Sequence, residues 1–425
     1  MYSKLITQTT LPWGATVLSA AFPVHGTVSF VGSIAGGSRM AGTEELAKIH
    51  AAMLAEGTAK RTKKDIQLFL DDIGASLSFG SSNDRLVFAG RVSEKNLHKL
   101  FAFVAEALLE PSFPARELTV LKQREQSNLA LEAQDTRTQA SIALSRALFS
   151  PEHPNYAHTT DESLAILSSI TRKTLVAFHE SILSRKTLIV SIAGDITLER
   201  AAKLVDQKFK KLPAREVTLP EFAPSEAAEA KREIVALPHK ASIDYMTGIA
   251  LGITSDHADY AALMLGMQVL GNPRGFTGRL MKTVREEEGL TYGVYASMPG
   301  ISAKTDGYAM VWGTFAPALF PQGRAAIRRE IEKIVDKGVT DAEVKKHREL
   351  YDAYTRVQLA DSASLAQVGH NLAAQGRTAA YLDRFTKTVL SLDSKHIRAA
   401  LKTYLKPELF SEAAAGPIEK NALAS

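Results

Sequence analysis

Arg285 and Tyr292 stand seven residues apart and carry side chains that could act together on a polar ligand. A guanidinium and a phenol are donors of fixed geometry, which can hold a peptide carbonyl group and stabilise the charge that develops on its oxygen during attack. The alternative is an arginine in a surface ion pair with Glu286–Glu288 and a tyrosine that fills one face of a strand. The spacing alone favours this second interpretation.

The segment Leu46–Thr58 has the outline of a metal-binding helix without the ligands. A zinc helix of this kind reads His-x-x-Glu-His, because two imidazoles one turn apart share the metal and the carboxylate activates water. In this register the three places hold Lys48, Ala51 and Ala52. An ammonium ion and two methyl groups can neither coordinate zinc nor take a proton from water. We therefore expect no hydrolysis by this chain alone, and we expect Lys48 on the solvated face of its helix.

Three histidines also invite a metal assignment. His50 and Glu56 are six residues apart and so lie on different faces of a helix, which favours a core or interface histidine. His153 and His158 flank a Pro-Asn turn and have no carboxylate at ligand spacing. We expect these two in a loop that could contribute to a subunit contact.

Composition excludes several classes of protein. The 425 residues, 45% of them hydrophobic, are enough for two or three domains. The net charge of +5 comes from scattered basic residues, and the dense run Lys60–Lys64 has no interleaved aromatic residues, so a solvated helix entry is favoured over a nucleic-acid surface. The absence of cysteine excludes disulfides, thiolate catalysis and cysteine-ligated metals.

The sequence shows no pattern typical of an exported or membrane-spanning protein. Met1–Pro12 lacks the basic segment and apolar core of a secretion signal. No apolar run approaches the roughly 20 residues that a membrane helix needs. We expect a cytoplasmic protein with no membrane partner.

The glycine-rich segment Gly271–Arg279 resembles a phosphate cradle only superficially. It lacks the order Gly-x-x-x-x-Gly-Lys-Ser/Thr and follows a helix instead of a strand, so we expect a flexible turn.

Hydrophobic periodicity in the first half predicts strands followed by blocks of helices. The expected elements are strands within 4–35, a helix over Ile66–Ile73, strands over Ser76–Gly80 and Arg85–Val92, a helix over Leu97–Leu108, two helices between Ala115 and Phe149 broken near Asp135, a helix over Leu164–Leu183, a strand over Thr187–Ala193 and a helix over Thr197–Phe209. This order favours the α+β class with mainly antiparallel sheets over a doubly wound fold.

The second half repeats this order after a linker rich in proline. The expected elements are strands over Ile243–Ile253, 292–298 and 308–314 and helices over Tyr260–Leu270 and Gln322–Lys337. Phe113–Leu118 resembles Val339–Val344, and the same offset, 113 to 339, places Asp135 on Asp361 and Ala140 on Ala366. We therefore expect two similar halves, 1–212 and 233–425, joined by a linker over 213–232.

These residues resemble one known family. The resemblance is carried by Leu46–Thr58, His153–Tyr156 with Asp161–Leu164, Ala193-Gly194-Asp195, and Gly278-Arg279-Leu280 with Val284–Val294. Together they resemble the pitrilysin/insulinase family of zinc metallopeptidases, in particular the short bacterial members related to mitochondrial processing peptidase. Its most specific part is Arg-x-x-x-Gly-Leu-x-Tyr, which begins at Arg285.

The resemblance implies that each half is an α+β sandwich and that two two-domain units close around a chamber. In some bacterial members one subunit supplies the zinc motif and the other an arginine and a tyrosine that hold the peptide. This chain resembles the second kind, with Arg285 and Tyr292 as the substrate-binding pair. The family's third zinc ligand would fall near Asn128, which is no carboxylate, and Glu125 and Glu132 lie three or four residues away. The resemblance also places the glycine-rich segment near the peptide, where it could shape or gate the chamber.

The sequence thus predicts a non-metallated subunit of a heterodimeric zinc peptidase, inactive alone, that binds extended peptide for cleavage by a homologous subunit. No cofactor is expected in this chain, and zinc is expected in the partner. Two alternatives stay open: a structural subunit like the core proteins of respiratory complexes, and a self-sufficient peptidase with unconventional ligands.

Overall fold

The computed structural model describes residues 2–22, 26–226, 228–275, 277–419 and 422–423. Within them the chain forms two compact units, each built from several stretches of sequence. Unit 1 contains 1–127, 162–221 and 354–384, and unit 2 contains 128–161, 222–353 and 385–425. The predicted division into 1–212, 213–232 and 233–425 follows the sequence repeat. The compact units differ from it, because 128–161 of the first half belongs to unit 2 and 354–384 of the second half belongs to unit 1.

Unit 1 is built on a six-stranded sheet in the order β1-β2-β6-β3-β5-β4. The strands are β1 (Ile6–Thr10), β2 (Thr16–Ala21), β3 (Thr27–Ala35), β4 (Ser76–Ser81), β5 (Arg85–Ser93) and β6 (Ile189–Gly194). Only the β2–β6 pairing is parallel among the pairs of this sheet. Both predicted hairpin strands, β4 and β5, are present within one residue of their predicted bounds.

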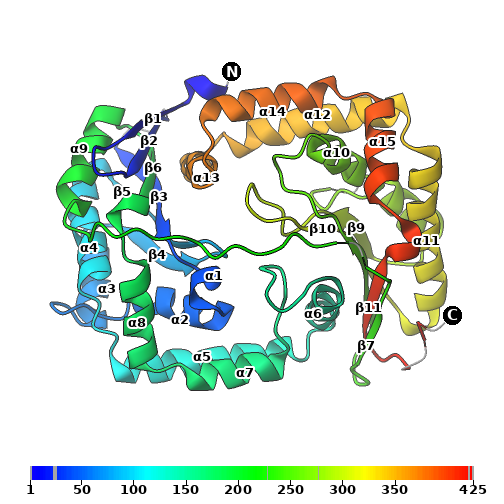
Figure 1. Cartoon of the computed structure of the whole chain (residues 1–425), viewed down its shortest axis with the longest axis horizontal. Helices are drawn as coiled ribbons and strands as arrows, with labels where there is room; N and C mark the ends of the chain where they lie inside the picture. Colours follow the sequence, from blue (N-terminus) through cyan, green and yellow to red (C-terminus); the bar gives the residue numbers. More distant parts are fainter. Residues whose placement is uncertain (1, 23–25, 227, 276, 420–421, 424–425) are drawn as a thin grey trace. The chain divides into compact units, whose positions relative to one another are not determined.

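Helices cover both faces of this sheet (Figure 1). One face carries α3 (Lys63–Asp72), α4 (Leu97–Leu109) and α9 (Leu198–Phe209), where Phe209 lies 5.6 Å from Phe101 and 6.0 Å from Phe88 between ring centroids. The other face carries α13 (Ser362–Ala374), whose Leu365 and Ala366 pack in one apolar cluster with residues of β2 and β3. Unit 1 also contains α1 (Ser38–Ala41), α2 (Glu44–Met53) and α8 (Arg172–Ile182), together with most of the helices over Ala115–Glu132 and Thr160–Ser169.

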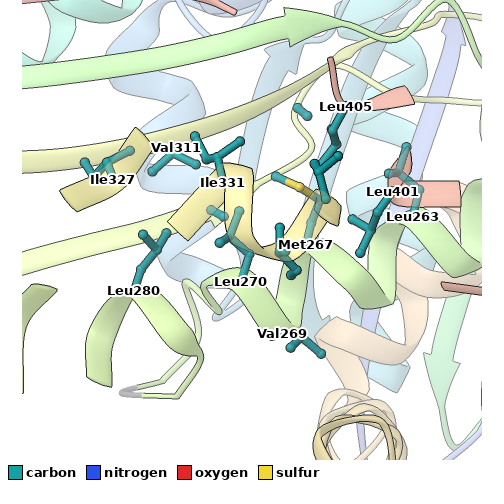
Figure 2. Close-up of a cluster of buried hydrophobic side chains, with 14 of the residues drawn as sticks. Leu263, Met267, Val269, Leu270, Leu280, Val311, Ile327, Ile331, Leu401 and Leu405 are labelled. Atoms are coloured by element: carbon teal, nitrogen blue, oxygen red, sulfur yellow. The ribbon is translucent and has the colours of Figure 1, made fainter. Parts of the chain in front are cut away.

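Unit 2 repeats the plan with a five-stranded sheet in the order β7-β11-β8-β10-β9. The strands are β7 (Arg232–Ala236), β8 (Ile243–Ala250), β9 (Gly293–Ser297), β10 (Tyr308–Phe315) and β11 (Ser411–Gly416). One face carries α6 (Thr136–Leu148) and the other α10 (Tyr260–Leu270), α11 (Phe320–Lys337) and α15 (Ser394–Tyr404). Figure 2 shows this second face, where Met267 and Leu270 of α10 meet Ile331 of α11 and Leu401 of α15.

The predicted duplication holds residue for residue in two pairs of helices, whose members are separated by the same offset that relates 113 to 339. Helices α5 (Ala115–Glu132) and α12 (Asp341–Gln358) each have 18 residues, and α6 and α13 each have 13. Asp135 and Asp361 cap α6 and α13 in the same way, accepting the N–H of Thr138 at 2.7 Å and of Ser364 at 3.0 Å. These findings confirm an α+β fold of two similar sandwiches.

Some predicted elements differ from the structure. The helix expected over Leu164–Leu183 is divided into α7 (Thr160–Ser169) and α8, because the Thr171 side chain caps α8 at Thr174 and stops the first helix. The alanine-rich β11, α14 (Ala379–Ser391) and α15 were not predicted, and β7 begins at the last residue of the predicted linker. Within the described residues, no helix is both long and apolar enough to cross a bilayer.

Candidate functional site

The structure brings the predicted pair Arg285 and Tyr292 together in unit 2. Arg285 lies in a π-helical segment, Met281–Glu287, and its Cζ atom is 5.1 Å from the centroid of the Tyr292 ring. Tyr292 directly precedes the edge strand β9 and is 83% exposed. The tyrosine therefore does not fill a strand face, and the two side chains present a cation–π pair to solvent.

Hydrogen bonds fix both ends of the turn between these two residues. Gly289, with φ of 63°, ends the helical segment, and its N–H donates to the Arg285 carbonyl oxygen at 3.2 Å. The buried Thr291 hydroxyl accepts the Gly293 N–H at 3.1 Å and donates to the Thr314 carbonyl oxygen of β10. Tyr292 is thus held by the backbone on both sides while its ring projects from the surface.

The neighbouring glutamates have basic partners. Glu287 lies 3.7 Å from Lys282, and the Glu288 carboxylate pairs with Arg329 of α11. In the alternative interpretation Arg285 forms a surface ion pair with these glutamates. It would then compete with Lys282 for Glu287 and with Arg329 for Glu288.

The degenerate zinc-motif positions lie on α2, as predicted. Ala51 is buried, Ala52 is half-buried, and the Lys48 ammonium group donates to the Glu125 carboxylate of α5. The Lys48 side chain is 50% exposed and that of Glu125 only 10%. Lys48 thus lies on the exposed face of its helix, as expected, and its charged end is in addition held by a carboxylate that lies far away in sequence.

These residues do not fit a zinc ion. The ammonium group of Lys48 only donates, Ala51 and Ala52 offer no lone pair, and the Glu125 carboxylate already accepts from Lys48. Glu132 is exposed at the end of α5. Across the part of the chain that the structure describes, no group of three or more His, Asp or Glu side chains is arranged to hold a metal ion.

His50 is a core histidine. It is fully buried against Phe113 and Phe178, and its Nε2 lies 2.9 Å from His179 Nδ1. Because His179 Nε2 contacts the Leu108 carbonyl oxygen at 2.9 Å, it carries the proton there, and His50 Nε2 donates to His179 Nδ1. Burial, with a smaller contribution from His179, lowers the pKa of His50 well below its usual value.

His153 lies in a loop, as expected, but it is buried and has an acidic partner in unit 2. Its Nδ1 accepts the Asn155 N–H at 3.1 Å, so Nε2 carries the proton and donates to Asp306 at 3.0 Å. The Ser225 N–H also donates to Asp306 at 2.9 Å. Burial opposes ionisation of Asp306, yet the hydrogen bonds from His153 and Ser225 hold its pKa below the usual value. No sequence pattern could indicate this pair, because Asp306 is 153 residues away from His153.

The glycine-rich segment has the bonds of a turn, although Phe276 lies outside the described residues. The Asn272 N–H donates to the Thr277 carbonyl oxygen at 3.2 Å. Arg279, at its end, donates to both carboxylate oxygens of Glu343, at 2.7 and 2.8 Å. Burial opposes ionisation of Glu343, but Arg279 and Thr340 lower its pKa to about 2. Arg279 therefore anchors this segment to α12.

The chain is similar to several known proteins. The profile described as "Insulinase (Peptidase family M16)" matches residues 16–157, and the profile "Peptidase M16 inactive domain" matches residues 169–351. An uncharacterised zinc protease of Mycobacterium leprae is 22% identical and covers 80% of this chain and 76% of its own length. The non-peptidase homolog YmxG of Helicobacter pylori is 24% identical, over 70% of this chain and 67% of its own.

Two further matches concern subunit architecture and fold. The bovine mitochondrial-processing peptidase subunit beta is 21% identical over 87% of this chain and 75% of its own length. The crystal structure of a peptidase M16 inactive domain from Pseudomonas fluorescens superimposes with a TM-score of 0.87 at 23% identity, over 97% of this chain and 98% of that one. The predicted family is thereby confirmed, and the chain belongs to peptidase family M16, the pitrilysin/insulinase metallopeptidases, as a member whose zinc-motif positions cannot bind zinc.

Proposed function

We propose that this chain is the non-metallated subunit of a heterodimeric zinc peptidase. It binds extended peptide substrate through Arg285 and Tyr292, helps to close the chamber, and leaves cleavage to a homologous subunit that holds the zinc. The observation that carries the proposal is the exposed contact between Arg285 and Tyr292 in a chain whose zinc-motif helix carries Lys48 paired with Glu125.

The chemistry of the pair suits the main chain of a peptide. The Arg285 guanidinium and the Tyr292 hydroxyl can donate hydrogen bonds to a peptide carbonyl oxygen, and the cation–π contact limits the rotamers of both side chains before substrate arrives. An extended peptide can bind by adding a strand to a sheet edge. In this mode hydrogen bonds to the peptide main chain contribute more to binding than contacts with its side chains. The chain offers such edges, among them β4 and β9.

The relatives support a non-catalytic role and a paired arrangement. One profile match carries the description "inactive domain", and one relative is named a non-peptidase homolog. Another relative is named as a subunit of a processing peptidase.

The test uses the purified complex of this chain with a homologous subunit that carries His-x-x-Glu-His. Arg285→Ala is expected to lower kcat/KM for peptide hydrolysis about 100-fold, the usual loss for one donor to a developing oxyanion, while the two chains still co-elute. Arg328→Ala is the matched control, because Arg328 is an exposed arginine of the same unit that pairs with Glu332 at 2.9 Å. Unchanged turnover in Arg285→Ala would overturn the assignment.

Metal analysis separates this proposal from a self-sufficient peptidase. The chain purified alone is expected to hold no stoichiometric zinc and to cleave no peptide, because Lys48, Ala51 and Ala52 provide no ligand. Stoichiometric zinc together with peptidase activity would contradict the proposal.

A further inference from the structure

An open groove lies beside α13 on the sheet of unit 1. Its volume is about 420 Å³, and its floor is formed by strands β3, β5 and β4. The polar lining and the facing helix residues are Ser29, Ser76, Ser78, Arg91, Ala363 and Gln367. Helix α13 packs chiefly against β6, β3 and β2. Its apolar cluster also reaches Val87 and Ala89 of β5, and the groove extends from Ala89 to the serines of β4.

The repeat shows why this groove is open. Ser362 of α13 bonds to Ser29, and its counterpart Thr136 of α6 bonds to Asp244, so Ser29 and Asp244 are equivalent positions in the two sheets. Ser29 pairs with Arg91 across the sheet. From this register, Ala89 and Ser78 of unit 1 correspond to Trp312 and Tyr295 of unit 2.

In unit 2 the equivalent space is filled. The Arg137 guanidinium of α6 lies 4.3 Å from the Trp312 ring and 5.3 Å from the Tyr295 ring. The residue of α13 that corresponds to Arg137 by the repeat is Ala363, which lines the groove. Three large side chains in one repeat are therefore replaced by Ala363, Ala89 and Ser78 in the other, and the groove is the space they leave.

The groove runs along an edge strand that can accept another strand. Among the described residues β4 is the last strand of its sheet. The Ser82 N–H donates to the Arg85 carbonyl oxygen at 2.9 Å and closes the β4–β5 hairpin. Counting from that pair, the backbone groups of Leu77 and Phe79 point away from β5, while the side chains of Ser76 and Ser78 face the groove. Every second side chain of a strand added to β4 would therefore enter the groove.

The groove carries one basic side chain. Arg91 is exposed, and within the described part of the chain its guanidinium has no hydrogen-bond partner. The positive charge of Arg91 contributes to the lowered pKa of Asp361, but the Asp361 carboxylate already accepts a hydrogen bond from the Ser364 N–H. A carboxylate that enters the groove can therefore form the charge-assisted, two-pronged contact that a guanidinium favours.

We propose that β4 binds an extended peptide by strand addition and that the groove receives an acidic side chain of this peptide, Asp or Glu, against Arg91. This inference rests on the proposed function in one respect, namely that the substrate is an extended peptide. It adds the substrate class: peptides with a carboxylate at a position whose side chain faces α13.

The experiment measures binding of two labelled peptides of about eight residues to the whole chain by fluorescence anisotropy. One peptide alternates Val with Glu and the other Val with Gln. The Glu peptide is expected to bind about tenfold more tightly, the typical effect of one charge-assisted contact. Arg91→Gln is expected to remove this preference without weakening the Gln peptide. Arg116→Gln, an exposed arginine on α5, is the matched control and is expected to keep the preference.

Two further variants test the groove and the strand. Ala363→Arg installs the side chain that fills the equivalent space in unit 2 and is expected to weaken binding of the Glu peptide about tenfold. Methylation of alternate backbone nitrogens in the Glu peptide is expected to abolish binding, because an added strand needs these donors.

Several outcomes would overturn the inference. Equal binding of the Glu and Gln peptides, or a preference that survives Arg91→Gln, would exclude an acidic subsite at Arg91. Full binding of the methylated peptide, or competition by free glutamate at the same concentration as the Glu peptide, would exclude strand addition. The proposed function is judged separately by hydrolysis in the assembled complex, where only an unaffected Arg285→Ala would remove it.

Discussion

The Lys48 ammonium group of α2 lies against the Glu125 carboxylate of α5, 77 residues away in sequence. Glu125 is 7% exposed, so its negative charge has little access to water, and Lys48 provides the opposite charge. In the motif His-x-x-Glu-His the position of Lys48 would hold a histidine ligand to a metal cation, whereas this chain places a side-chain cation there. The ion pair thus joins α2 to α5 without metal.

Loss of this ion pair is expected to destabilise unit 1. Lys48→Met leaves Glu125 without its counter-charge, and we expect a decrease of about 1–2 kcal/mol in the free energy of unfolding, since Lys48 itself is half exposed. Glu125→Gln added to Lys48→Met should restore part of this loss, because no uncompensated charge remains. Urea denaturation of the single and double variants measures the coupling, and additive effects would argue against the ion pair.

The hydroxyl and the ring of Tyr292 have separable roles. Tyr292→Phe keeps the ring beside Arg285 and removes only the donor, so we expect kcat of the assembled complex to fall about tenfold. Tyr292→Ala also releases Arg285 and is expected to approach the loss seen for Arg285→Ala. Thermal unfolding should be unchanged in both variants, because the side chain is 83% exposed. Equal activity of Tyr292→Phe and the unchanged protein would assign the role to the ring alone.

Stability is expected to decrease as the pH falls from 6.5 to 4. Burial and the positive charge of Arg85 lower the pKa of His370 to about 4, and burial and Lys346 lower that of His347 to about 4. Both histidines are therefore neutral in the folded chain at a pH where the unfolded chain, with pKa values near 6.5, already binds protons. The stabilisation is complete above pH 6.5 and is lost below it. Urea titrations at pH 7 and pH 5 measure the difference, and His370→Gln should make the decline shallower.

The two matching helix caps are expected to contribute equally. Asp135→Ala and Asp361→Ala each remove a side-chain acceptor for the third N–H of a helix, at α6 and α13. We expect each to lower the free energy of unfolding by about 1 kcal/mol. The hydrogen bonds to Thr138 and Ser364 lower the pKa of each aspartate, so the effect should be present at neutral pH and disappear in acid. A large difference between the variants at pH 7 would contradict the equivalence of the two caps.

Several parts of the fold follow from local sequence patterns. Helix α10 occupies the predicted bounds Tyr260–Leu270, because apolar residues make up most of its length and Gly271 ends it. The helix predicted over Ile66–Ile73 appears as α3, which begins at the Thr62 cap and is followed by Gly74 in the left-handed region. Such signals act over one or two turns, so they can be read from neighbouring residues alone.

Other elements depend on partners that are distant in sequence. The run Ser411–Gly416 is rich in alanine, which has little strand propensity, yet it forms the buried β11 because β7 and β8 pair with it on both sides. Helix α13 lies in the second half of the sequence but packs on the sheet of unit 1, a contact that no local pattern predicts.

The sequence by itself determined the family, the duplicated α+β plan, the loss of zinc ligands at Lys48, Ala51 and Ala52, and the spacing of Arg285 and Tyr292. Residue types and short-range spacing are sufficient for these, because a methyl group cannot bind zinc in any fold. Only the tertiary structure decided that Lys48 meets Glu125 and that a groove opens beside Ala363. Contacts between segments far apart in sequence depend on how sheets and helices pack, and periodicity records that a side chain is buried but not against what.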